Sequence, residues 1–190
     1  MRTLYAFAVP TLWLAWCVYW WLAGRDVKPT VRRESLASRA GHILPLVIVV
    51  LLLAPPSLPF GFLSGRILPA TASVFFVGLA LIVAGLLLTV WARVYLGRNW
   101  SGIVTLKLGH ELVSGGPYRW VRHPIYTGLL LAIGGSAVVR SEWRGVLALA
   151  IAFVALWRKL KLEERWMDEA FGEQYAAYRA RVAALIPFVL

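Results

Sequence analysis

Long apolar runs separated by polar segments dominate this chain. The first run extends from Thr3 to Leu22 and includes Pro10, which predicts a kink. The second, Gly41 to Ala54, ends at Pro55-Pro56, and the third extends from Ile67 to about Tyr95. A helix needs about 20 residues to cross the hydrocarbon core of a membrane. The first and third runs therefore predict membrane-spanning helices, and the second reaches that length by extension at its start.

Two shorter apolar runs follow in the second half. They cover Ile125 to Val139 and Gly145 to Trp157, and Ser141 to Arg144 joins them as a tight helical hairpin. The remainder, Arg158 to Val182, is charged and amphipathic, and Gly172 predicts a break between two helical pieces. The pattern predicts an all-α integral membrane bundle of about five transmembrane helices with a helical C-terminal tail. We interpret 1–190 as a single membrane domain, with three spans in 1–95 and the chemistry in 96–190.

Composition and charge support a membrane protein and orient it. The chain of 190 residues is 60% hydrophobic, whereas soluble domains average about 45–50% apolar residues. The net charge of +11 could suggest nucleic acid, but most Lys and Arg lie in the first loop, in the segment from Arg93 to Arg122 and after Arg158. Cytoplasmic loops are enriched in Lys and Arg. We therefore predict an outside N-terminus, a cytoplasmic C-terminus and no nucleic-acid partner.

Several single residues have a packing interpretation. Gly78 and Gly85, seven residues apart in the third run, predict close helix packing, either within the chain or between copies. The lone cysteine, Cys17, is interpreted as a small apolar residue, and His42 as structural.

The segment from His110 to Gly128 is too polar to face lipid. It contains two His, two Tyr, two Arg and two Pro, and each polar group in hydrocarbon costs several kcal/mol. The segment must lie at the membrane face or line a pocket. His123-Pro124 predicts a helix start, and the glycines before Pro117 allow the backbone to approach a ligand closely.

Two further features suggest binding of a charged ligand. The rings of Tyr118 and Tyr126 could face a sulfonium or ammonium group, because an aromatic ring face attracts cations. Glu163 and Glu164 follow the last apolar run beside Arg158 and Lys159. The carboxylates could hold a ligand ammonium, and the basic residues could orient an anionic substrate. No spacing of His, Cys, Asp and Glu indicates a metal site.

In combination, these motifs resemble the isoprenylcysteine carboxyl methyltransferase family and related phospholipid methyltransferase-like membrane enzymes. The matching segments, in order, are Leu96-Gly-Arg-Asn-Trp-Ser-Gly102, His110-Glu-Leu-Val113, Gly116-Pro-Tyr118, Arg122-His-Pro-Ile-Tyr-Thr-Gly128, Glu163-Glu164, Phe171-Gly-Glu-Gln-Tyr175, Tyr178 and Ile186-Pro-Phe188. They cover about half of the chain.

The resemblance implies an S-adenosylmethionine-dependent methyltransferase whose C-terminal tail completes the cofactor pocket. By position it implies cofactor-binding roles for His110, Leu112, Val113, Tyr118, His123, Pro124, Tyr126 and Glu163, with Glu164 as the substitute if the register slips by one. The family's substrate-orienting arginine aligns best with Lys159, with Arg158 adjacent. The implied reaction is carboxyl methylation of an isoprenylcysteine-like acceptor, with S-adenosylhomocysteine as the product. The implied partners are a lipophilic small-molecule or prenylated substrate and membrane lipids.

Three alternatives stay open from the sequence. A phospholipid amine could be the methyl acceptor, in which case His123 or a glutamate would have to accept a proton. An NADPH-dependent reductase of sterol-like double bonds shares similar motifs but is typically longer. A non-enzymatic membrane scaffold or transporter subunit is disfavoured, because no charged residue marks a pathway through the bilayer.

Overall fold

The computed structural model describes residues 2–25, 27, 30–54, 61–100, 105–107 and 112–189. The helices are α1 (Arg2–Ala23), α2 (Leu36–Leu53), α3 (Ala72–Leu96), α4 (Pro124–Arg140), α5 (Trp143–Phe171) and α6 (Glu173–Arg181), with short 3₁₀ turns at Gly61–Ser64, Gly97–Asn99 and Gly116–Arg119. Two short strands, β1 (Thr30–Arg33) and β2 (Thr105–Lys107), form an antiparallel pair. The predicted helical bundle is therefore present, and this strand pair is an addition to it.

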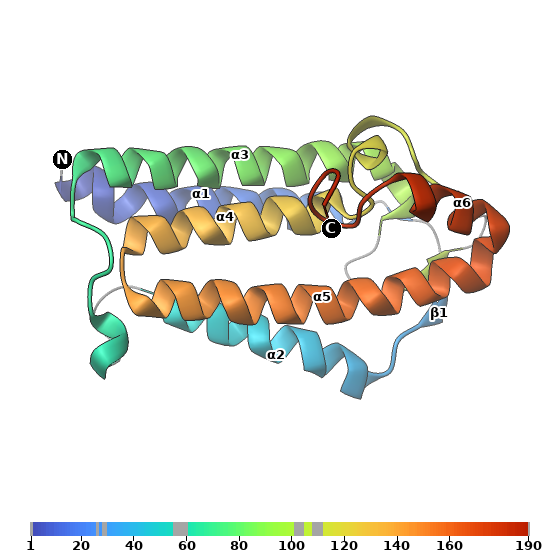
Figure 1. The fold of residues 1–190 in the computed structure, drawn as a ribbon, viewed down its shortest axis with the longest axis horizontal. Coiled ribbons are helices and arrows are strands. Elements are labelled where there is room, and N and C mark those ends of the chain that lie inside the picture. The colour runs from blue at the N-terminus through green and yellow to red at the C-terminus, as the bar shows by residue number, and fades with distance from the viewer. Residues whose placement is uncertain are drawn as a thin grey trace.

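The long helices lie side by side in two groups. Helices α1, α3 and α4 form one group, and α5 packs on α2 in the other (Figure 1). The loop that carries the 3₁₀ turn Gly116–Arg119, helix α6 and the charged half of α5 all lie at one end of the bundle (Figure 1). The polar motif segment and the tail, far apart in the sequence, thus meet at the same end.

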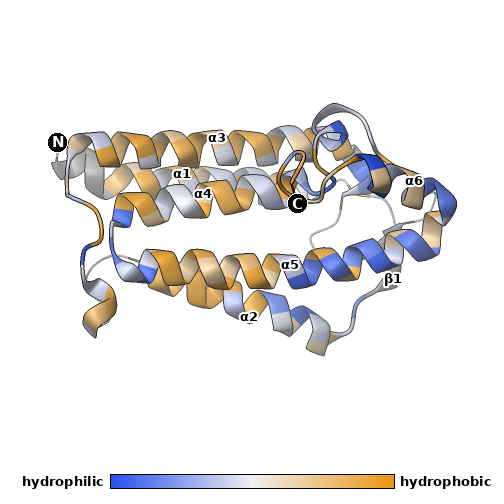
Figure 2. Cartoon of the chain, viewed as in Figure 1, coloured by the Kyte–Doolittle hydropathy of each residue, from blue (hydrophilic) through white to orange (hydrophobic). Residues whose placement is uncertain are grey.

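The outer faces of the helices are apolar, as a lipid environment requires. Large side chains such as Leu14, Leu87 and Val154 are more than 60% exposed, and hydrophobic residues cover most of the bundle outside its polar end (Figure 2). Among the described residues, Leu36–Leu53 and Ala72–Asn99 are long and apolar enough to cross a membrane, while Phe7–Ala23 and Pro124–Arg140 are shorter apolar helices.

Glycines allow α3 and α4 to pack in direct backbone contact. A Cβ atom on Gly85 would lie 2.5 Å from the carbonyl oxygen of Gly128, and one on Gly78 would lie 2.7 Å from that of Gly135. The close packing predicted for Gly78 and Gly85 is confirmed, and it occurs within the chain. We call this close contact between α3 and α4 the seam. In lipid no hydrophobic effect drives two helices together, so van der Waals contact of this kind stabilises their packing.

Helix α5 is longer than the sequence pattern predicted. It has 29 residues, about 43 Å at 1.5 Å per residue, and continues without interruption through Arg158. Its first half is apolar and its second half is charged (Figure 2), so the second half extends beyond the membrane-spanning part. The predicted break at Gly172 is confirmed, with φ at +50°.

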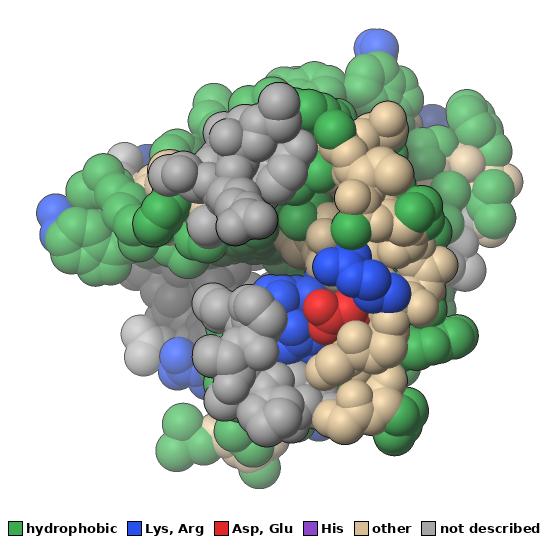
Figure 3. Space-filling model, turned by 90° about the vertical axis from the view of Figure 1, so that its left-hand side faces the viewer, with side chains coloured by type: hydrophobic (Ala, Val, Ile, Leu, Met, Phe, Trp, Pro, Cys, Tyr) green, Lys and Arg blue, Asp and Glu red, His purple; other side chains and the backbone are tan. Residues whose placement is uncertain are grey.

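The predicted hairpin between α4 and α5 is confirmed and is anchored by charged side chains. Ser141 ends α4 in a left-handed conformation. Arg140 Nη2 donates to the carbonyls of Leu53 and Ala54 at the end of α2, and Arg144 pairs with Glu142 at 2.5 Å. Figure 3 shows charged side chains gathered among hydrophobic ones at this end of the molecule.

Two predicted boundaries differ from the structure. The loop expected at Gly24–Arg39 contains β1, and α2 begins at Leu36 because Ser35 caps it by accepting a hydrogen bond from the amide of Ser38. The third run begins its helix at Ala72, capped by Thr71. The amide of Ile67 instead donates to the carbonyl of Ser141, which holds this segment against the hairpin.

Candidate functional site

The imidazole of His123 lies between the two carboxylates of the Glu163-Glu164 pair. His123 precedes α4, where Pro124 occupies the first helical position, and the glutamates project from the charged half of α5. The Nδ1 atom of His123 is 3.6 Å from Glu163 Oε2, and its Nε2 atom is 3.5 Å from Glu164 Oε1. The structure therefore brings together the two segments that the sequence predicted to meet.

Glu163 is also bound by Tyr126 and approached by Lys159. The Tyr126 hydroxyl donates to Glu163 Oε1 at 2.5 Å, and its ring stacks on the His123 ring with centroids 5.5 Å apart and an angle of 2°. Lys159 Nζ lies 4.0 Å from Glu163 Oε1 and 5.4 Å from the centre of the Tyr126 ring. Lys159 and Glu163 are four residues apart on α5, a spacing that places their side chains next to each other on the helix surface.

Glu164 is held by Arg122, a residue for which the sequence alone indicated no role. Arg122 donates from Nε and Nη2 to Glu164 Oε1 at 2.8 and 2.5 Å. Lys161 Nζ lies 3.6 Å from Glu164 Oε2. The signal that could have identified Arg122 is its place directly before His123, since a buried cation next to a helix start needs a carboxylate partner.

These contacts shift the pKa values of His123, Glu163 and Glu164 in the directions that favour the charged form of each group. Burial disfavours the charged form of His123, but the two neighbouring carboxylates outweigh burial and raise its pKa. Burial would likewise raise the pKa of both glutamates, but His123 and the nearby cations lower the pKa of Glu163 and hold that of Glu164 at about 2. The cluster therefore favours a protonated imidazole between two ionised carboxylates, and the lowered pKa values make both carboxylates weak bases.

The two glutamates differ in accessibility. The Glu163 side chain is 22% exposed and the Glu164 side chain only 5%. Glu164 is enclosed by Arg122 and Lys161, so it stabilises the fold of this end. Glu163 retains an open side. His123 Nε2 faces Glu164 Oε1 at 3.5 Å, so the imidazole is turned toward both carboxylates and not toward solvent.

Helix α6 and the C-terminal segment close one side of the cluster. The hydroxyl of Tyr178 donates to the carbonyl of Tyr118 at 2.6 Å. The amides of Arg122 and His123 donate to the carbonyls of Ala183 and Ala184, which forms a parallel bridge between the motif segment and the tail. Burial raises the pKa of Tyr178 to about 12, so its hydroxyl stays protonated and acts as a donor.

The other predicted site residues lie in different positions. Tyr118 and Pro124 are buried next to the cluster, and Leu112 and Val113 are half-buried. His110 lies outside the described residues. The glycines before Pro117 pack on Tyr95 rather than facing an open ligand space, because a Cβ on Gly116 would lie 2.5 Å from that ring.

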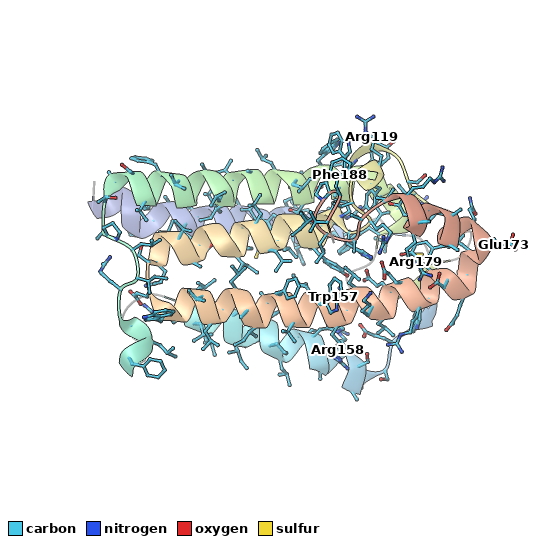
Figure 4. The ribbon with its side chains drawn as sticks, in the orientation of Figure 1. Arg119, Trp157, Arg158, Glu173, Arg179 and Phe188 are labelled. Carbon is cyan, nitrogen blue, oxygen red and sulfur yellow. The ribbon has the colours of Figure 1, made fainter. Side chains whose placement is uncertain are left out.

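Arg158 does not reach the cluster. Its guanidinium donates to the carbonyl of Ser38 and packs against Gly41 of α2, whereas Trp157 points to the other side of α5 (Figure 4). Of the two basic residues predicted to orient the substrate, Lys159 reaches the cluster and Arg158 does not.

A second acid–imidazole pair lies between α2 and α5. His42 Nε2 is 3.3 Å from Glu34 Oε1, with the two side chains 4% and 1% exposed, and the hydroxyl of Ser38 donates to Glu34 Oε2 at 3.0 Å. The sequence predicts a structural role for His42 and gives no indication of its pairing with Glu34. No sequence signal paired them, because the strand β1 that positions Glu34 has only four residues.

The fold and the cluster together define a class: a helical membrane protein with a charged, tyrosine-walled site at one end of the bundle. The sequence model of the phospholipid methyltransferase family matches residues 73–174. This match covers more than half of the chain, and the chain belongs to that family.

The chain is also similar to curated relatives. It is 32% identical over 118 residues to protein-S-isoprenylcysteine O-methyltransferase B of Arabidopsis thaliana, covering 59% of this chain and 58% of the relative. It is 34% identical over 100 residues to the protein-S-isoprenylcysteine O-methyltransferase of Saccharomyces cerevisiae, covering 49% and 40%. It is 35% identical over 71 residues to methanethiol S-methyltransferase 1 of Bradyrhizobium diazoefficiens, covering 37% and 24%.

A solved structure has the same fold. The eukaryotic intramembrane Ras methyltransferase ICMT, an isoprenylcysteine carboxyl methyltransferase, superposes with a TM-score of 0.60 at 22% identity, covering 80% of this chain and 52% of that one. The predicted helical membrane fold is confirmed. The chain spans less than two thirds of the length of each of these four proteins.

Proposed function

We propose that this protein is an S-adenosylmethionine-dependent methyltransferase that acts at the membrane on a lipophilic carboxylate, such as an isoprenylcysteine. The observation that carries the proposal is the meeting of His123 and Tyr126 with Glu163. A site at the polar end of an apolar bundle suits a polar cofactor that arrives from water and an acceptor that arrives from lipid.

The residues of the cluster fit the cofactor. S-adenosylmethionine carries a sulfonium, an ammonium and a carboxylate, and supplies an electrophilic methyl group. Glu163 has an open side for the ammonium group, and the rings of Tyr118 and Tyr126 favour a nearby cation. Leu112, Val113 and Pro124 would add apolar wall, and His110 would join them by the family resemblance. Glu164 is occupied by Arg122, so we assign the cofactor contact to Glu163.

The charge state of the cluster favours a carboxylate acceptor over an amine. Methylation of an amine needs a group that accepts a proton. The raised pKa of His123 favours its protonated form, which cannot accept a further proton, and the lowered pKa of Glu163 makes that carboxylate a weak base. A carboxylate acceptor is already ionised at neutral pH and needs only positioning and partial desolvation. Lys159 lies beside Glu163 and would orient the anion.

Binding of S-adenosylhomocysteine to the purified protein tests the proposal. We expect Glu163→Gln to weaken that binding by about tenfold or more, because a hydrogen bond to a charged group contributes about 1.5–3 kcal/mol. The matched control is Glu173→Gln, which removes an exposed charge from the start of α6. Equal affinity of E163Q and the parent protein would remove Glu163 from the cofactor site.

The acceptor is tested by methyl transfer to two lipids. We expect incorporation into N-acetyl-S-farnesylcysteine and none into phosphatidylethanolamine. The opposite result would assign amine methylation, and binding of NADPH in place of S-adenosylhomocysteine would assign a reductase. We also place the site on the cytoplasmic side, as the distribution of Lys and Arg predicts.

A further inference from the structure

A groove of about 350 Å³ opens between α5 and the C-terminal segment, beside the cluster. Four basic side chains line it, from Arg122, Lys161, Arg179 and Arg181. Its lining does not include His123, Tyr126 or Glu163, so the groove is distinct from the proposed cofactor site.

The charges around the groove do not balance. Glu164 pairs with both Arg122 and Lys161, and Asp168 pairs with Arg179 at 2.6 Å. The described contact of Arg181 is with a backbone carbonyl, that of Ala177. Among the residues that the structure describes, four cations therefore face two carboxylates, and the excess positive charge favours an anion.

The groove also has an apolar edge. Trp157 lines it at the point where the apolar half of α5 ends, which is the depth where Trp is enriched in membrane proteins. Phe188 and Val189 line it from the C-terminal segment and are 99% and 77% exposed. Phe188 adopts a φ of +65°, which is unfavourable for a bulky residue and presents its ring outward (Figure 4). Exposed apolar side chains next to unbalanced cations fit an amphiphile better than a soluble anion.

We propose that this groove binds the headgroup of an anionic phospholipid, with its phosphate among the four basic side chains and its acyl chains along Trp157 and Phe188. Arg122 and Lys161 contact both the groove and Glu164. A bound headgroup would therefore sit next to the ion pairs that hold the tail on the cluster. The proposal concerns binding alone and does not depend on methyl transfer.

Native mass spectrometry of the detergent-solubilised protein tests the proposal. The probes are palmitoyl-oleoyl phosphatidylglycerol and the matching phosphatidylcholine, offered together. We expect the protein to retain one phosphatidylglycerol in preference to phosphatidylcholine, and we expect inorganic phosphate not to displace it. In the Arg179→Gln/Arg181→Gln variant we expect affinity for phosphatidylglycerol to fall about 25-fold, because each basic residue near an anionic membrane surface contributes roughly fivefold.

The control variant is Arg119→Gln/Arg165→Gln. It removes the same net charge from two exposed residues outside the groove, and we expect it to bind like the parent protein. Equal loss in both double variants would mean a nonspecific charge effect and would overturn the site. Equal retention of the two lipids by the parent protein, displacement of phosphatidylglycerol by inorganic phosphate, or its competitive displacement by N-acetyl-S-farnesylcysteine would also overturn it. An unchanged melting temperature in both variants verifies that the fold is intact.

Discussion

The charged state of His123 depends on two carboxylates and sets how this end responds to pH. Its pKa is raised in the folded protein, so the stabilisation it provides is complete below the ordinary histidine pKa of about 6.5. That stabilisation is lost as the pH rises through the raised value. Protonation of His123 thus contributes to the stability of this end, and the same ring forms a wall of the proposed site.

We predict that His123→Gln flattens the alkaline limb of the stability profile. The melting temperature of the parent protein should fall as the pH rises from neutral to about 9, and that of the variant should fall less. Differential scanning fluorimetry in detergent measures both curves. The acidic limb, where Glu164 titrates toward its pKa of about 2, should persist in the variant because Arg122 remains. Parallel alkaline limbs would show that His123 is neutral in the folded protein.

Arg122 connects the cluster to the C-terminal segment. Its guanidinium donates to Glu164 and to the carbonyl of Val182. A lysine at this position would keep the positive charge but lacks the planar fork, so it could not make both contacts of the guanidinium. We predict that Arg122→Lys destabilises the protein by about 2–3 kcal/mol and speeds hydrogen exchange at the amide of His123 at least tenfold. Arg119→Lys, at an exposed position in the same segment, is the control and should exchange like the parent protein.

For single residues, the sequence predicted those of the site motifs but not the residues that hold them in place. His123, Tyr126, Glu163 and Glu164 stand in recognisable motifs, and the structure brings them together. Arg122 and the Glu34–His42 pair were missed because their partners come from other elements of the fold. Pairing of side chains that are distant in sequence depends on helix packing, which one sequence does not reveal.

Among the elements, the seam between α3 and α4 determines where the site can form. Gly85 and Gly128 face each other at backbone contact, and α4 begins directly after His123. Any displacement of α4 would therefore move His123 away from the glutamates on α5. Because α4 carries Gly128 at the seam and begins directly after His123, packing at the seam determines the position of His123 in the cluster.

We predict that Gly128→Ala is strongly destabilising and Gly134→Ala is not. A Cβ on Gly128 would lie 2.5 Å from the Gly85 carbonyl oxygen, whereas one on Gly134 first meets a Leu149 side chain at 3.9 Å. Forced overpacking costs about 1–3 kcal/mol, and alanine at an open helical position is neutral or favourable. Thermal unfolding of the two variants in the same detergent measures the difference. Equal melting temperatures would mean that the seam is not tightly packed.

Apolar runs predicted the helices well because their length and composition follow from the membrane itself. The strands β1 and β2 were not predictable, since three or four residues carry no periodicity. The uninterrupted α5 was also missed. The change from apolar to charged residues at Arg158 does not coincide with the end of the helix, which continues to Phe171. Composition alone does not distinguish a change of environment along a helix from its end.

For the whole molecule, the two ends of the bundle differ in their chemistry. The hairpin end holds Glu142 and Arg144 as an ion pair. The other end holds the cluster and the groove with its four basic side chains, and it is the more hydrophilic end (Figure 2). An asymmetric distribution of Lys and Arg orients a membrane protein with its basic end in the cytoplasm. The functional end should therefore face the cytoplasm, where a polar methyl donor is available.

This orientation predicts opposite labelling of two engineered cysteines. In a Cys17→Ser background, Glu173→Cys lies on α6 at the basic end, and Ser64→Cys lies in the connection near the hairpin; both positions are exposed. A membrane-impermeant maleimide added to sealed inside-out vesicles should label E173C and spare S64C, and intact cells should give the reverse. Labelling depends only on which side of the membrane each cysteine faces, so the result does not depend on enzymatic activity. Labelling of both cysteines from one side would place the two ends of the bundle in the same compartment and contradict a spanning arrangement of α3 and α5.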